Sequence, residues 1–497
     1  MATKKERQPE AEALVEEKTL LDDLFDKVDM QVPKEVEVAT AGGRMSRALN
    51  EMIHAVVRSG EAVDRVDKTL LDGMIAQLDA KISDQVDEIM HHEDFQKMES
   101  AWRGVKFLID RTDFRRNIKL EILNVSKEEL MADFEDVPEP YQSGLFKHLY
   151  KDEYDTPGGE PIGAMIANYE FLNHPQDIGL LNNVSKIAAS CHAPFIGSVG
   201  QKFLGLRSIG DLTQIPDVAP LFDTPEFAKW KAFRDTEDSR YVGLTLPRFL
   251  LRLPYGEDTK PAKTFNYSER VSGEDHEKYL WGNASFAFAS CLSRSFAEHG
   301  WCVNIRGPQA GGVVDDLPLH HYDAEGDTVT KIPTEVLMSE RREFELAELG
   351  FIAFSFYKNR DYACFFSANS CQKPKLYIDA DSTANSRLSA RLPYLFLVSR
   401  LSHYLKVIQR ENIGAAKEKE DLQLELEEWL NQYVTEDKSP SAAAKARYPL
   451  SLGKITVTDI ADNPGFYNVE MLVRPHFQVE GVDVSLSLVS RLPKGKK

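Results

Sequence analysis

The chain has 497 residues, of which 42% are hydrophobic, and a formal net charge of −19. This length predicts more than one domain built around a sizeable core. The acidic balance argues against a nucleic-acid partner, because phosphate binding depends on Lys and Arg, and it favours a partner with a basic surface.

Residues 1–44 are predicted to form a flexible arm that carries one short amphipathic helix. Residues 1–18 are charged and lack the apolar stretch of a secretory signal. Thr19 with Asp22 forms a capping-box signature, and the apolar residues that follow fall on one helical stripe. A helix this short is barely stable alone, so its apolar face docks either on this protein or in a partner's groove. The sequence leaves both open. The apolar face consists of Leu20, Leu21, Leu24, Phe25 and Val28.

Residues 45–372 are predicted to form a mixed α/β domain. Residues 45–110 show helical periodicity, with an apolar stripe from Leu70 to Ile89. Further along, short apolar runs alternate with helical patterns, and a helix is expected to start at residues 126–129. Such alternation is typical of an α/β fold. The expected strands are residues 117–125, 162–169, 193–196 and 351–357.

Residues 373–497 are predicted to form a C-terminal domain with helices over 386–409 and 416–434 and a small-residue linker at 439–446. The second helix carries many carboxylates. A charged helix face is usually solvated, but it can also engage a complementary basic surface. The acids in question are Glu418, Glu420, Asp421, Glu425, Glu427 and Glu428.

Two strands with Gly481 between them are predicted at the end of the chain. A lone hairpin is marginally stable and has two unpaired edges. It must therefore join a sheet, either in its own domain or in another subunit, and the pattern leaves both arrangements open. The alternating apolar residues are Tyr467, Val469, Met471 and Val473 in the first strand and Val482, Val484, Leu486 and Leu488 in the second.

The sequence carries few signatures of catalysis. We find neither a phosphate-binding glycine loop nor a nucleophile elbow. Cys191 beside His192 is better explained as a buried structural cysteine than as a nucleophile with its base. The adjacent residues His320 and His321 point apart and serve one metal ion poorly. We therefore expect no catalytic residue, cofactor or metal. A cytoplasmic α/β enzyme with a site made of scattered residues stays an alternative.

The cysteines and the apolar runs bear on location. Five cysteines without a CxxC pair fit a reducing compartment. The apolar runs are too short to span a bilayer. We expect a cytoplasmic protein without membrane insertion.

Several motifs, spread in order from about residue 45 to the end, resemble one protein family, the large subunit of the contractile sheath of type VI secretion systems (TssC/VipB). Because the match is distributed along the chain, it is more specific than any single motif. The motifs are Ala101–Leu108, Pro157–Gly163, Phe249–Gly256, Trp281–Ala284, Ser386–Tyr394, and Asn463–Phe466 with Val473–Phe477.

This resemblance implies a multi-domain, contractile tail-sheath-like fold with a flexible N-terminal arm. It implies a structural protein that assembles with a small sheath subunit (TssB/VipA) and with further copies of itself around the Hcp tube. Contraction would drive the tube and its spike into a target cell, with baseplate components as further partners. A AAA+ ATPase, ClpV, would then recycle the sheath. A sheath subunit of another phage-tail-like particle is the alternative.

The resemblance also implies roles for the three unusual segments. The N-terminal helix would be the element that the ATPase captures, through its apolar face. The terminal strands would pair with strands of neighbouring subunits. The acidic helix would belong to an inner sheath domain and face the tube.

Overall fold

The structure is a computed structural model, and part of the chain is described in it. The predicted helix at residues 20–28 and the predicted strand at residues 482–488 lie outside the described residues. Within them, none of the helices combines the length and apolarity needed to cross a membrane. The described residues are 68–257, 259–262, 265–273, 275–324, 326–435, 437, 439–460 and 466–478.

Two compact units make up the chain. The first consists of residues 1–86 with 264–267, and its described part is mainly helical. The second consists of residues 87–263 with 268–497, and it contains the sheets and the main hydrophobic core.

The helices begin and end at recognisable capping residues. Ser126 and Glu129 form a reciprocal capping box at the start of α5. Gly300 ends α10 in the left-handed conformation, with φ at 80°. The α-helices are α3 (Lys68–Met90), α4 (Glu93–Asp110), α5 (Lys127–Glu135), α6 (Gly144–Phe146), α7 (Pro175–Cys191), α8 (Ala219–Phe222), α9 (Ala228–Arg234), α10 (Ala284–His299), α11 (Glu340–Glu348), α12 (Ala380–Ser389), α13 (Leu392–Glu411), α14 (Lys419–Asn431) and α15 (Ala442–Arg447).

A mixed six-stranded sheet in the order β1-β2-β3-β9-β10-β6 forms the centre of the second unit. β1, β2, β3 and β9 are parallel, and β10 and β6 continue the sheet in antiparallel pairs. β2 and β3 are buried along their whole length, as expected for parallel strands covered on both faces. The strands are β1 (Met165–Phe171), β2 (Phe195–Val199), β3 (Val242–Leu246), β4 (Phe249–Leu250), β5 (Trp281–Gly282), β6 (Val313–Val314), β7 (His320–Ala324), β8 (Asp327–Lys331), β9 (Phe351–Phe356), β10 (Ala363–Phe365), β11 (Leu450–Asp459) and β12 (Tyr467–Pro475).

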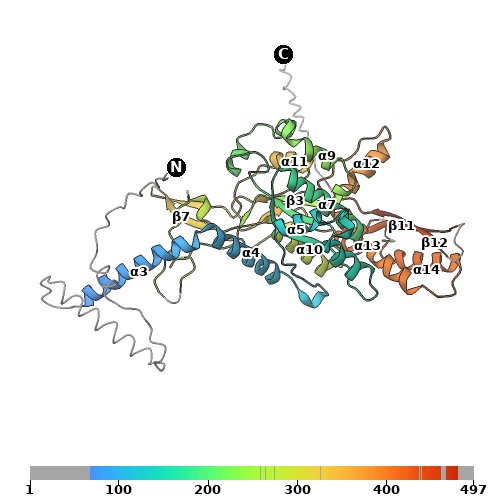
Figure 1. Ribbon diagram of the computed structural model, residues 1–497, viewed down its shortest axis with the longest axis horizontal. Helices are drawn as coiled ribbons and strands as arrows, with labels where there is room; N and C mark the ends of the chain where they lie inside the picture. Colours follow the sequence, from blue (N-terminus) through green and yellow to red (C-terminus); the bar gives the residue numbers. More distant parts are fainter. Residues whose placement is uncertain are drawn as a thin grey trace, which may run out of the picture. The chain divides into compact units, whose positions relative to one another are not determined.

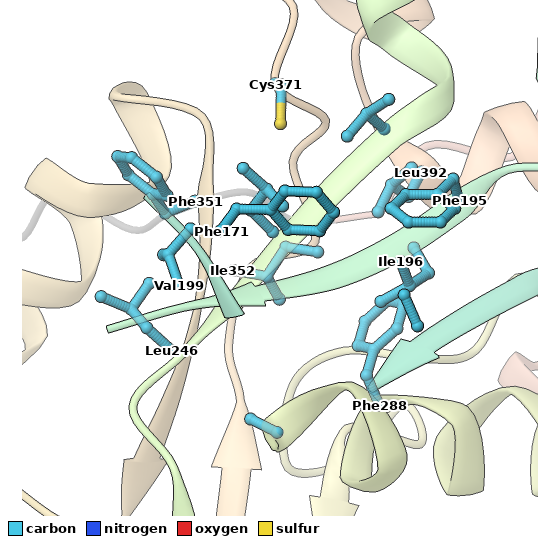
Figure 2. Close-up of a cluster of buried hydrophobic side chains, with 14 of the residues drawn as sticks. Phe171, Phe195, Ile196, Val199, Leu246, Phe288, Phe351, Ile352, Cys371 and Leu392 are labelled. Atoms are coloured by element: carbon cyan, nitrogen blue, oxygen red, sulfur yellow. The ribbon is translucent and has the colours of Figure 1, made fainter. Parts of the chain in front are cut away.

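Helices pack on this sheet through a core rich in aromatic side chains. α10 contacts β1, β2 and β3, and α7 contacts β2 and β3 (Figure 1). Figure 2 shows Phe171, Phe351 and Phe288 among the residues of this core. A Cβ atom at Gly243 would lie 2.9 Å from the Cδ1 atom of Leu392, so glycine allows the first turn of α13 to approach the sheet.

The mixed α/β fold is confirmed, and several predicted elements are found close to their expected positions. The strands expected at 162–169, 193–196 and 351–357 are β1, β2 and β9. The helix expected to start at residues 126–129 is α5. Helix α3 covers the stripe that ends at Ile89, although Ile89 itself is exposed.

Three predictions about local structure were wrong. Residues 117–125 contain no strand of this chain's own sheets. The helix predicted over 386–409 is divided into α12 and α13, because Pro393 lacks the N–H that a continuous helix would need there. The linker predicted at 439–446 contains most of α15, whose N-cap is the side chain of Ser441.

Candidate assembly interface

Strands β11 and β12 form a separate two-stranded antiparallel sheet in the second unit. Figure 1 shows them side by side, with α14 along them. β12 is the first of the two predicted terminal strands, and its partner is β11, which the sequence reasoning missed. β11 carried the same signal, since Ile455 and Val457 alternate with exposed Lys454, Thr456 and Thr458.

The hydrogen-bond register shows which residues of β12 face its outer edge. In an antiparallel pair, positions that exchange hydrogen bonds alternate with positions whose N–H and C=O groups point away. The N–H of Ile460 donates to the carbonyl of Phe466, at 3.1 Å, so even-numbered residues are the bonded positions. Consistently, the N–H of Val457 points away from β12 and donates to Oε1 of Gln423 at 3.4 Å.

The odd-numbered residues of β12 therefore present their backbone groups to the outer edge. Among the residues that the structure describes, β12 pairs with β11 alone. These outward positions are the four apolar residues that the sequence singled out in the first terminal strand: Tyr467, Val469, Met471 and Val473.

The side chains of the same four residues pack within the chain. They are half-buried against a cluster formed by α13, α14 and β11, in which Leu426, Leu430 and Ile455 are at most 1% exposed. The apolar face of the strand is thus satisfied by its own domain. Its backbone edge is open in the described part of the chain.

The outer edge of β11 is partly covered by the chain itself. Leu450 forms a parallel bridge with Val434. Its N–H donates to the carbonyl of Tyr433 at 3.2 Å, and Thr435 donates back to the carbonyl of Leu450 at 3.0 Å. The side chain of Gln423 covers Val457. Among the described residues the two edges of this sheet therefore differ, since other segments cover part of the β11 edge and none pairs with the β12 edge.

The chain that leaves β12 is anchored to the core. The N–H of His476 donates to the carbonyl of Pro449 at 3.0 Å. The N–H of Gln478 donates to the hydroxyl of Tyr394 at 3.0 Å, and its Nε2 donates to the carbonyl of Val303 at 3.1 Å. Burial lowers the pKa of His476, with Lys445 acting in the same direction, so the imidazole is neutral near pH 7.

Most of the acidic residues on α14 have local partners. Glu418 and Asp421 form a capping box at its start. Glu425 pairs with Lys417 at 2.5 Å, between Oε2 and Nζ. Glu427 accepts a hydrogen bond from Gln423.

Glu420 and Glu428 are the two acids of the set whose carboxylates are exposed and have no hydrogen bond or ion pair within the described part of the chain. Leu424, on the same helix, is 59% exposed.

The cysteine and histidines that the sequence offered as catalytic or metal-binding candidates take part in burial, capping and packing. Cys191 is buried, and burial raises the pKa of its thiol to about 12, so it is not a thiolate at neutral pH. His192 caps α7 and lies 3.2 Å from the hydroxyl of Tyr241. His320 is buried while His321 is exposed, as expected for neighbours on a strand. In the described part of the chain, His, Cys, Asp and Glu form no group of three or more suited to a metal ion.

The second unit also contains buried ion pairs near β4. Glu335 has a side chain that is 1% exposed, and it lies 2.7 Å from Arg248 and 3.2 Å from His276. Burial alone would raise the pKa of Glu335, but His276 and Arg248 hold it at about 2. Arg252 joins Glu269 in a second such pair, at 2.6 Å. Removing one partner of such a pair leaves a buried charge, so these contacts maintain one fixed arrangement.

Comparison with known proteins places these features in context. Residues 72–372 match the family described as EvpB/VC_A0108, tail sheath N-terminal domain, and residues 381–492 match its tail sheath gpW/gp25-like domain. The type VI secretion system sheath protein TssC1 of Pseudomonas aeruginosa is 45% identical over 431 residues, which cover 86% of each chain.

Two solved assemblies also have similar chains. The anti-feeding prophage baseplate contains one with 11% identity and a TM-score of 0.37, over 76% of this chain and 84% of that one. The contracted helical sheath of the anti-feeding prophage contains one with 11% identity and a TM-score of 0.31, over 62% of this chain and 66% of that one.

Proposed function

Since this chain belongs to the EvpB/VC_A0108 (VipB) tail sheath family and is a large subunit of a type VI contractile sheath, we propose that it works mechanically and catalyses no reaction. It assembles into a helical sheath with copies of itself and a small companion subunit. Work in such a sheath comes from an extended packing that relaxes to a more stable contracted one. The subunits must then stay connected while they move.

The open edge of β12 is the observation that carries this proposal. Tyr467, Val469, Met471 and Val473 turn their backbone groups to that edge, while their side chains hold the strand on α14. A strand of a neighbouring subunit can add there through main-chain hydrogen bonds. Each such bond contributes about 0.5–1.5 kcal/mol.

This division of roles suits a moving assembly. The side-chain packing fixes β12 to its own subunit, and the backbone ladder joins it to the next one. A ladder tolerates bending and twisting of the strands, so neighbouring bodies can rotate without losing the connection. The predicted second strand, with Val482, Val484, Leu486 and Leu488, would belong to the same shared sheet.

The boundary between the two functional parts lies near residue 373 in this proposal. Residues 45–372 would form the main sheath domain, and residues 373–497 the inner domain with the shared strands. The gap between the two matched ranges, which end and begin at residues 372 and 381, supports this boundary. Residues 1–44 would remain a flexible arm.

The inner domain would face the Hcp tube with the acidic helix α14. Because Glu418, Asp421, Glu425 and Glu427 have partners within the chain, contact with a basic tube surface would fall mainly to Glu420 and Glu428.

The N-terminal helix would recruit the recycling ATPase, ClpV. Its proposed contact face is the apolar set Leu20, Leu21, Leu24, Phe25 and Val28. A helix that is marginal alone gains stability when its apolar face enters a groove. The whole cycle would take place in the cytoplasm, with baseplate components at the end where assembly begins.

Coexpression with the small companion subunit tests the function directly. The complex should form tubules visible by electron microscopy, and deletion of residues 466–497 should abolish them. A stable soluble monomer that neither binds the companion nor assembles would overturn the proposal.

Two substitutions at Met471 separate the backbone edge from the side chain. Met471→Ala and Met471→Pro both remove the half-buried side chain, but only proline removes the outward N–H. We expect tubules from the alanine variant and few or none from the proline variant. Equal assembly of both would show that the outer edge of β12 is not the junction.

A further inference from the structure

We propose that residues 118–124 form a second docking strand, which receives an extended, apolar segment of the small companion subunit with acidic residues at one end. This inference rests on the proposed function, because it requires a companion subunit. Residues 118–124 are distant in sequence from β12. The partner proposed for them is the companion subunit, whereas the partner proposed for β12 is a neighbouring copy of this chain.

The segment has the pattern of a strand but no ladder. Ile118, Leu120 and Ile122 alternate with Lys119 and Glu121, which predicts a half-buried strand. Yet it belongs to none of the sheets. Within the described part of the chain, the backbone groups of residues 118–124 make no hydrogen bond to another residue. An amphipathic strand without a ladder is a template for another chain.

The same segment exposes apolar side chains that its own chain leaves uncovered. Leu120 is 39% exposed, Leu123 is 52% exposed and Ile122 is 66% exposed. Single exposed apolar residues are common, but Leu120 and Ile122 lie two positions apart and therefore expose apolar side chains on one face of an extended strand, while Leu123 lies on the other face.

Residues of defined conformation bound the segment at both ends. At its start, Asn117 ends a short helical turn in the left-handed conformation. At its end, the hydroxyl of Tyr169 donates to the carbonyl of Val125 at 2.5 Å, and Ser126 caps α5. A strand held in this way loses little conformational entropy when a partner binds.

The charge at the start of the segment indicates the chemistry of the partner. Residues 111–116, which precede it, carry Arg111, Arg115 and Arg116 against Asp113, in a chain whose net charge is −19, while Lys119 within the segment pairs with Glu160. The side chains of Arg115 and Arg116 are 90% and 66% exposed. A surface recess of about 500 Å³ is lined by three arginines and two acids, namely Arg111, Arg116, Arg294, Asp113 and Glu298. Carboxylates of a partner would lie at this end.

The companion subunit is the occupant that fits. Copies of this chain are assigned to the edge of β12 in the proposed function, and each identical copy offers the same surfaces. We therefore assign residues 118–124, with the arginines that precede them, to the small companion subunit. The charge cluster and the apolar surface select an apolar strand with an acidic end, rather than a helix.

Another exposed apolar segment provides a contrast within the same chain. Leu376, Tyr377 and Ile378 are 76%, 52% and 110% exposed. Here, however, the N–H of Lys375 donates to the Ser386 hydroxyl at 2.8 Å, and the N–H of Tyr377 donates to the Thr383 hydroxyl at 2.9 Å. These backbone groups are already satisfied, so this segment is a matched control.

Hydrogen–deuterium exchange of the assembled sheath tests the docking strand. Because residues 118–124 lack internal hydrogen bonds in the described part of the chain, protection of their amides requires a partner. We expect at least tenfold slower exchange there in tubules than in the same complex dissociated by salt. Tubules in which these amides exchange at the dissociated rate would overturn this inference and leave the proposed function intact. Failure to form tubules would count against the proposed function instead.

Neighbouring proline substitutions test whether the contact is a ladder. Consecutive N–H groups of a strand point to opposite edges, so Glu121→Pro and Ile122→Pro block different edges. One of the two should reduce companion capture at least tenfold, and the other should reduce it much less. Ile378→Pro is the control and should capture normally. Normal capture by both test variants would contradict the claim that the companion binds this segment through backbone hydrogen bonds.

Charge reversal and cross-linking test the identity of the occupant. Arg116→Glu should weaken companion capture, and Arg387→Glu, at an exposed position on α12, should not. An Ile122→Cys variant that carries a short thiol-reactive cross-linker should link to the companion subunit in tubules. A link to a second copy of this chain would overturn the assignment.

Discussion

Arg306 donates a hydrogen bond from its Nε to the side-chain oxygen of Gln478 at 2.8 Å, and this contact joins the segment after β12 to the core of the same subunit. Arg306 is 5% exposed. A buried guanidinium held by a side chain that follows the interface strand fixes where the chain leaves its own domain. A sheet shared with a neighbouring subunit, as proposed above, would then transmit force directly to the core of this subunit.

We expect Gln478→Ala to make the segment that follows β12 more mobile. The substitution removes the bonds to Arg306 and Val303, and leaving a buried group with fewer partners costs about 1–3 kcal/mol. Limited proteolysis of the complex with the companion should show faster cleavage after β12. Phe477→Ala, at a side chain that is 64% exposed, is the control and should be cleaved at the normal rate. Equal rates for both variants would contradict the anchoring role.

The packing of β12 on α14 predicts very different effects for two leucines on that helix. Leu426 is fully buried and Leu424 is 59% exposed. Leu426→Ala should destabilise the complex by about 2–5 kcal/mol, because it leaves a cavity under the strands. Leu424→Ala should change it by about 0.5 kcal/mol or less. Urea denaturation of the two variants checks this. Similar midpoints would show that α14 does not support the sheet.

A buried histidine predicts how stability depends on pH. Burial, together with nearby Arg400, lowers the pKa of His403 from 6.5 to about 4, while its Nε2 donates to the carbonyl of Cys191 at 2.8 Å. The folded state therefore favours the neutral imidazole. As the pH falls from 6.5 toward 4, the unfolded state binds the proton first, and stability is lost by up to about 3 kcal/mol.

The variant His403→Gln should remove this part of the pH dependence. Relative to the original protein, it should gain stability between pH 7.5 and pH 5, as measured by the unfolding temperature of the complex. The exposed residue His321 provides the control, since His321→Gln should leave the profile unchanged. If the unfolding temperature of His403→Gln falls with pH in parallel with that of the original protein, His403 is not the source of the pH dependence.

The N-terminal helix yields a prediction from sequence alone. Leu24→Ser with Phe25→Ser should leave tubule assembly unchanged but weaken capture by the ATPase about a hundredfold or more, because each lost apolar contact is worth about 1.5 kcal/mol or more. Val36→Ser with Val38→Ser, in the same arm, is the control. If pull-down by the ATPase is unchanged in the test variant, the helix has another role.

Local patterns were sufficient for much of the fold. Short apolar runs located β1 and β9, and a helix-start signal at residues 126–129 located α5, because these signals act on neighbouring residues of the same element. The family resemblance was available for the same reason, since its motifs are short and contiguous. The helix predicted over residues 416–434 contains α14, on which Leu422, Leu426 and Leu430 are buried.

Only the tertiary structure decided which strands pair with each other, and which backbone N–H and C=O groups remain unpaired at their edges. The pattern of residues 117–125 predicts a strand, yet within the described residues no other strand pairs with them. Likewise, the apolar alternation of Tyr467 to Val473 could not reveal that the side chains pack against α14 while, among the described residues, no strand pairs with the outer edge of β12. Periodicity reports which face of a strand is apolar, but the register of a ladder depends on residues distant in sequence.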